Sequence, residues 1–135
     1  MTRIIGAILI AGSGLLVVYA EGFHWIALWN QLPLAAAALA ILRGTASGKG
    51  PTWSAIAFAG VTTLVIALTH AAWVFDWGET QTGSSTAGLI FLFSPIYSVL
   101  LGTVVWAVTR GLERFGRKRN AAQQDAPADA KKRRG

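Results

Sequence analysis

The fold is decided by two uncharged stretches, WSAIAFAGVTTLVIALTHAAWVF (residues 53–75) and AGLIFLFSPIYSVLLGTVVWAVT (residues 87–109). Each contains 23 residues, and a helix needs about 20 apolar residues to cross the hydrocarbon core of a bilayer. The segment between them is short and carries Asp76 and Glu79. Two such runs joined by a polar loop predict an antiparallel pair of transmembrane helices.

Two further uncharged runs precede this pair, at residues 4–20 and 23–42. Only Glu21 and Gly22 separate them, and so short a connection predicts a second antiparallel pair. The segment Val18-Tyr19-Ala20 also fits a signal-peptide cleavage site, which is the alternative interpretation of the first run. With that run retained, we predict an all-α integral membrane protein with four transmembrane helices in two antiparallel hairpins.

The composition supports lipid as the main solvent. The chain is 53% hydrophobic and only 13% charged, whereas soluble domains carry about 25% charged residues. Between residues 4 and 109 the charged side chains are few: Glu21, Arg43, Lys49, Asp76 and Glu79. The chain has no cysteine, which excludes disulfides, thiolate metal ligands and a cysteine nucleophile.

The basic residues predict the orientation of the chain. All 12 Lys and Arg side chains lie in residues 1–3, the loop at 43–52 and the segment 110–135, and four spans place these segments on one side. The positive-inside rule then predicts that both termini lie on the cytoplasmic side of a bacterial inner membrane. We predict residues 1–109 as the membrane domain and residues 110–135 as a basic tail that is largely disordered.

The tryptophans fit the same topology, because indole rings prefer the boundary between lipid and water. All six fall near the predicted ends of spans two, three and four. The predicted interfacial anchors are Trp25, Trp29, Trp53, Trp73, Trp77 and Trp106.

Ionisable side chains gather on the predicted outer side: Glu21, His24, His70, Asp76 and Glu79. Of these, His70 lies inside a predicted span, and an ionisable residue within a membrane is a candidate functional group. A metal or proton site is one interpretation. A neutral His70 bonded to a neighbouring helix is the other, and we favour it because no HxxxH or HExxH ligand spacing is present. We therefore predict no metal ligand, no cofactor and no catalytic residue.

Small residues recur at four-residue spacing on the last two spans, where they let helix backbones approach closely. The predicted packing face consists of Ala55, Ala59, Thr63, Ala67, Ala71, Ser94, Ser98 and Gly102. It fits packing inside one bundle or at a homodimer interface.

Prolines interrupt two spans. Pro95 has no N–H to donate to the carbonyl of Phe91, so we predict a kink there and expect Ser94 or Ser98 to satisfy that carbonyl. An ordinary structural kink is the favoured interpretation, and a gate or substrate niche is the alternative. Pro33 is expected near the first turn of its helix, where the missing donor costs least.

A cluster of basic residues follows the last span: Arg110, Arg114, Arg117, Lys118 and Arg119. We expect these side chains to attract anionic lipid. No aromatic-interleaved or folded binding module accompanies them, so nucleic acid is not expected as a partner.

In size and number of spans the chain resembles the small multidrug resistance transporters, a family whose essential acidic residue lies within the first helix. Glu21 instead lies at the end of the first span, and no residue role is transferred. We predict a small, non-enzymatic inner-membrane protein that serves as an accessory or interaction subunit, with a membrane protein partner or further copies of itself. The alternative is a small homo-oligomeric transporter or channel that uses His70 and the Pro95 kink.

Overall fold

The computed structural model describes residues 2–46, 50–83 and 88–132. Every long element in these residues is a helix: α1 (Thr2–Glu21), α2 (Trp25–Ala46), α3 (Trp53–Val74) and α4 (Leu89–Lys132), with a short 3₁₀ turn, η1 (Trp77–Glu79), before α4. All four α-helices are long and apolar enough to cross a membrane, which is consistent with an integral membrane protein. The predicted spans begin and end within a few residues of α1, α2 and α3.

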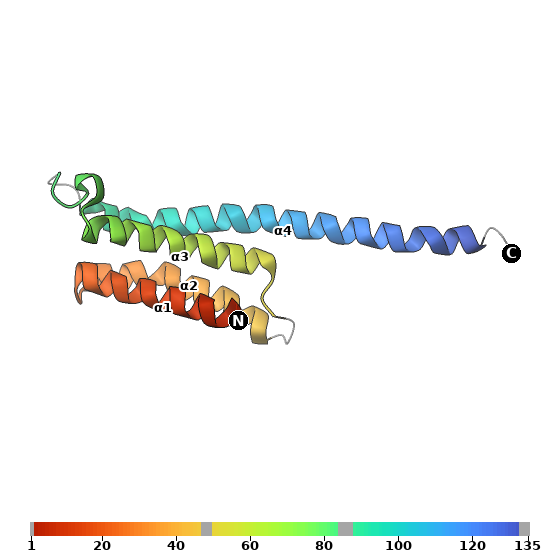
Figure 1. The fold of residues 1–135 in the computed structure, drawn as a ribbon, viewed down its shortest axis with the longest axis horizontal. Helices are drawn as coiled ribbons and strands as arrows, with labels where there is room; N and C mark the ends of the chain where they lie inside the picture. Colours follow the sequence, from red (N-terminus) through yellow and green to blue (C-terminus); the bar gives the residue numbers. More distant parts are fainter. Residues whose placement is uncertain (1, 47–49, 84–87, 133–135) are drawn as a thin grey trace.

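The helices form a bundle in which consecutive helices lie side by side and reverse direction (Figure 1). Helix α3 contacts the other three, whereas α1 and α4 make no contact with each other in the described residues. We call the end that holds the α1–α2 turn and η1 the "η1 end". The opposite end, from which α4 projects, is the "tail end" (Figure 1).

Local signals in the sequence fix several helix ends. Gly22 adopts φ +75°, and its N–H donates to the carbonyl of Val18 over 2.9 Å, which closes α1 with a left-handed cap. Thr52 begins α3 by accepting a hydrogen bond from the N–H of Ala55. Pro33 lies inside α2 and not in its first turn, where packing against neighbouring helices makes proline tolerable.

Large apolar side chains cover the outside of the bundle. Leu15 is 71% exposed and Leu28 is 68% exposed, as lipid-facing side chains are. Many of the buried side chains are small or polar: Ser13, Asn30, Ser54, Thr62, Thr63, His70, Ser94 and Ser98. This distribution is the inverse of a water-soluble core and concentrates polar chemistry between the helices.

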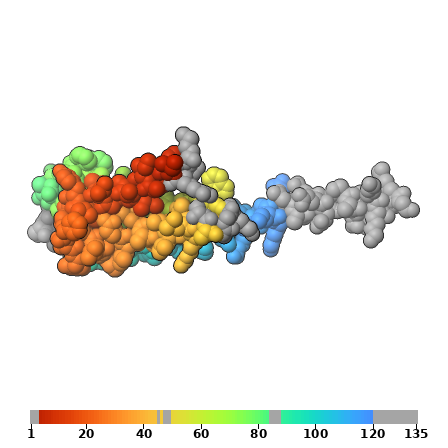
Figure 2. All heavy atoms as spheres, turned by 90° about the horizontal axis from the view of Figure 1, so that it is seen from below, coloured from red at the N-terminus to blue at the C-terminus, as the bar shows by residue number. Residues whose placement is uncertain are grey.

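Helix α4 extends past the predicted span. The predicted span ends at residue 109, whereas α4 runs for 44 residues, twice the 22 of α3. Glu113 contacts Ser54 at the start of α3, so residues 114–132 project about 28 Å beyond the bundle (Figure 1). Figure 2 shows the beginning of this projection, as far as residue 119. The segment is rich in helix-forming Ala, Gln, Lys and Arg and extends an existing helix, which avoids the cost of nucleation. We call residues 114–132 the "α4 arm".

Candidate functional site

The structure brings together two residues of the predicted outer cluster, Glu21 and His70. Glu21 is the last residue of α1, and His70 lies four residues before the end of α3. The His70 Nε2 atom is 2.6 Å from Glu21 Oε1, and the two side chains are 0% and 2% exposed. A short hydrogen bond between ionisable groups therefore ties α1 to α3 inside the bundle.

Hydrogen-bond chemistry limits the protonation states of this pair. The His70 Nδ1 atom is 2.8 Å from the carbonyl oxygen of Ile66, and a carbonyl only accepts, so Nδ1 carries a proton. One further proton then lies between Nε2 and Glu21 Oε1. Either the carboxylic acid donates to a neutral imidazole or an imidazolium donates to a carboxylate. Both arrangements leave the pair with no net charge, which suits a buried site.

Aromatic rings cover the pair from α4. The ring of Phe91 lies 4.9 Å from that of His70, and Trp73 packs against the edge of Phe91 at 4.8 Å. The second carboxyl oxygen of Glu21, Oε2, is buried and has no hydrogen-bond partner. This open acceptor is the one feature of the pair that helix packing does not account for.

The other three members of the outer cluster serve elsewhere. The Nδ1 atom of His24 accepts from the N–H of Ala27 over 3.4 Å in the first turn of α2. Glu79 lies in the exposed loop with φ +57°. Asp76, also at positive φ, organises the loop that follows it.

Asp76 accepts three hydrogen bonds, from the side chain of Thr82 and from the N–H groups of Gln81 and Thr82. Led by the Thr82 hydroxyl, these bonds hold the pKa of the Asp76 carboxyl below its usual value, because they favour its charged form. Within the described residues, no three His, Cys, Asp or Glu side chains converge as metal ligands. The two histidines have different partners, Ala27 for His24 and Glu21 for His70.

A second buried polar site surrounds Pro95, which lies within α4. The Nδ2 atom of Asn30, on α2, donates to the carbonyl of Phe91 over 2.9 Å, which is the group that Pro95 leaves without its helical donor. We expected Ser94 or Ser98 to fill this role. Instead Ser94 donates to Asn30 Oδ1 over 2.8 Å, and Ser98 donates to the carbonyl of Pro95. A side chain from α2 therefore supplies the hydrogen bond that Pro95 cannot donate within α4.

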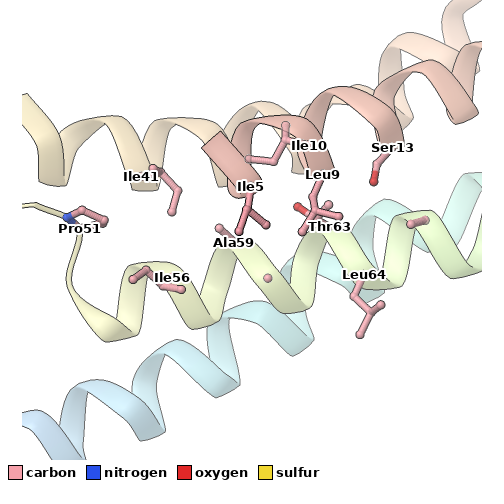
Figure 3. A pocket seen from close by; sticks show the side chains of 13 residues that line it. Ile5, Leu9, Ile10, Ser13, Ile41, Pro51, Ile56, Ala59, Thr63 and Leu64 are labelled. Carbon is pink, nitrogen blue, oxygen red and sulfur yellow. The ribbon is translucent and has the colours of Figure 1, made fainter. Parts of the chain in front are cut away.

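The small residues predicted as one packing face divide between several contacts. On α4, Ser98 accepts from Thr62 through its carbonyl, and a side chain at Gly102 would overlap the Thr62 hydroxyl. On α3, three members of the series line a groove against α1 (Figure 3): Ala59, Thr63 and Ala67. Ala55 lines a different groove, beside α2 and α4. The series of small residues on α3 and the series on α4 therefore do not face each other.

The tryptophans fall into two groups. Trp29 and Trp73 contact α4, where Trp29 donates to the carbonyl of Leu92 over 3.0 Å and Trp73 packs on Phe91. The remaining four are at least 42% exposed: Trp25, Trp53 and Trp77 near the ends of helices, and Trp106 within α4.

The basic cluster lies where α4 leaves the bundle. Arg114, Arg117, Lys118 and Arg119 are exposed, and Arg110 pairs with Glu113 at 3.7 Å. The role of Glu113 was not predicted: its carboxylate accepts from both the N–H and the hydroxyl of Ser54. The sequence feature that could have indicated it is a single acidic residue among the first basic residues of the tail. For Asn30 the corresponding feature is an amide side chain inside an apolar span.

Comparisons with known proteins identify no relative: no family model, no curated protein and no solved structure matches this chain. The site must therefore be interpreted from its own geometry.

Proposed function

We propose that this chain is a four-span protein of a bacterial inner membrane, built as two antiparallel hairpins with both termini in the cytoplasm. The charge distribution supports this orientation. The η1 end carries Asp76 and Glu79 and no basic side chain, whereas every Lys and Arg of the chain belongs to the segments of the tail end. The positive-inside rule then assigns the tail end to the cytoplasm.

We further propose that the protein is non-enzymatic and acts as an accessory or interaction subunit of a membrane assembly. The observation that carries this proposal is the α4 arm, which leaves the bundle as a helix and exposes the side chains of residues 114–119. At the base of the arm Leu112 is 68% exposed and Phe115 is 71% exposed, beside Arg114 and Arg117. Apolar anchors next to cationic groups suit an acidic, partly apolar partner surface on the cytoplasmic side, either another protein or a second copy.

The interior of the bundle supports the same proposal. Its polar groups hold helices to one another: Glu21 with His70, and Asn30 with Ser94 and the Phe91 carbonyl. Gln31 likewise donates to the carbonyl of Gly14 and links α2 to α1. Helices tied in this way suit a rigid membrane anchor better than a passage for solutes.

Site-specific photocrosslinking in intact cells tests the interaction. A photoreactive residue at Phe115 should capture one defined protein, and charge reversal by Arg114→Glu with Arg117→Glu should abolish that product. A photoreactive residue at lipid-facing Leu64, which is 57% exposed on α3, is the matched control and should yield mainly lipid adducts. Equal, charge-independent products from both positions would refute the interaction proposal.

A transporter or channel is the second candidate, and the unpaired Oε2 of Glu21 beside His70 is the observation that favours it. Proton or solute flux into proteoliposomes distinguishes the two functions. Under the interaction proposal His70→Ala leaves flux at the background of empty liposomes, as does the unmodified protein. A flux that the unmodified protein supports and His70→Ala abolishes would establish the transporter.

A further inference from the structure

A groove of about 430 Å³ lies between α2, α3 and α4 toward the tail end. Its lining is apolar over most of its length and becomes polar at Arg43. The lining residues are Ala36, Leu39, Ala40, Arg43, Ala55, Phe58, Thr103 and Trp106. The groove is therefore amphipathic. Most of its described lining residues have apolar side chains, and one of them, Arg43, is a cation.

Arg43 is available to an external anion. It lies in the last turn of α2, its side chain is exposed, and neither of the two ion pairs found in the described residues includes it. Trp106, also in the lining, is 42% exposed, as a ring at the lipid–water boundary is expected to be. An unpaired guanidinium and an interfacial indole thus share one groove.

We propose that this groove binds one anionic phospholipid, with the phosphate on Arg43 and an acyl chain along Ala36, Ala40 and Phe58. Arginine forms strong charge-assisted hydrogen bonds to phosphate, and basic pockets between transmembrane helices on the cytoplasmic side suit anionic head groups. The inference rests on the proposed orientation of the helices in the membrane. It concerns a site inside the helix bundle and not the general attraction of lipid to the α4 arm.

A second groove in the same bundle shows why charge selects the occupant. It has a volume of about 520 Å³ and lies between α1 and α3, with contributions from Ile41 and Pro51 (Figure 3). Among the described residues that line it, none carries a charge. Bilayer hydrocarbon can fill this groove, but none of these described side chains distinguishes an anionic lipid from a neutral one.

Native mass spectrometry of the delipidated full-length protein tests the site, with dioleoylphosphatidylglycerol as the anionic probe and dioleoylphosphatidylcholine as the zwitterionic one. We expect one phosphatidylglycerol to bind preferentially. Arg43→Gln should weaken that binding by about fivefold, and Arg43→Lys should retain most of it. Ala40→Phe, which fills the groove while keeping Arg43, should also weaken it.

Lys131→Gln is the matched control, because it removes one positive charge near the end of α4 and leaves the groove unchanged. It should change binding less than twofold. Equal retention of both lipids, or equal losses in Arg43→Gln and Lys131→Gln, would overturn the proposal, as would an Ala40→Phe protein that binds normally. Circular dichroism of each variant confirms that its helices are intact. Failure of the crosslinking experiment on the α4 arm would not affect this result, because the two experiments probe different surfaces.

Discussion

At the scale of single residues, the Glu21–His70 hydrogen bond is the contact whose environment matters most. Each group would be well hydrated on a soluble surface, but here their side chains are almost completely buried. Removal of one partner therefore leaves the other without a hydrogen bond in a place where water does not replace it.

We predict that Glu21→Ala and His70→Ala each lower the free energy of unfolding in detergent by about 1–2 kcal/mol, because each leaves a buried polar group unpaired. The double variant should lose about 1 kcal/mol less than the sum of the two. Glu21→Gln is the control, since its amide can still donate to His70 Nε2 and should preserve most of the stability. Strict additivity in thermal or denaturant unfolding would show that the two side chains do not interact.

Asp76 gives a pH-dependent prediction at the same scale. Its pKa is lowered in the folded loop by the hydrogen bonds from Thr82 and Gln81, relative to about 3.9 in an unfolded chain. The stabilisation of the loop is therefore complete above about pH 4 and is lost as the pH falls through the lower folded-state pKa. The amide chemical shift of Thr82, followed by NMR, should titrate with a midpoint below 3.9. Asp76→Asn should abolish that transition, and a midpoint above the usual value would contradict the hydrogen-bond assignment.

At the scale of elements, α4 lacks one backbone hydrogen bond, and a side chain of another helix supplies the missing donor. Pro95 removes a backbone donor in α4, and Asn30 of α2 replaces it. The hydrogen bond between α2 and α4 therefore depends on the carbonyl that Pro95 leaves unpaired within its own helix.

We predict that Asn30→Leu lowers the free energy of unfolding by about 1–3 kcal/mol, because it leaves the Phe91 carbonyl and the Ser94 hydroxyl without their partner. In a Pro95→Ala background the same substitution should cost less, since the N–H of the new alanine can bond to Phe91 within the helix. Unfolding of the two single variants and the double variant measures this coupling. An Asn30→Leu loss that is the same in both backgrounds would show that Asn30 does not compensate for Pro95.

At the scale of the whole molecule, the proposed orientation is open to a direct test, because the chain has no cysteine of its own. We predict that a cysteine introduced by Thr80→Cys reacts with a membrane-impermeant maleimide added to intact cells, whereas Asp125→Cys reacts only after the cells are permeabilised. The physical reason is the bias of all 12 basic residues toward one face. Reaction at position 125 with silence at position 80 would invert the topology.

The sequence predicts the number and approximate limits of the helices because uncharged runs of 17 to 23 residues have few alternatives. It does not predict the partners of buried side chains. Glu21 and His70 are 49 positions apart and Asn30 and Phe91 are 61 apart, so their pairing depends on how the helices rotate about their axes. The sequence also does not show that α4 continues past residue 109, because the predicted span ends with the last uncharged residue of the run.

One consequence of the uninterrupted α4 concerns mechanics. Phe91, whose ring packs against His70, and the α4 arm belong to one helix that is continuous from Leu89 to Lys132. A force that acts on the α4 arm is therefore transmitted along this helix to the aromatic ring beside the buried pair. A single helix thus connects the tail end of the protein mechanically to its η1 end.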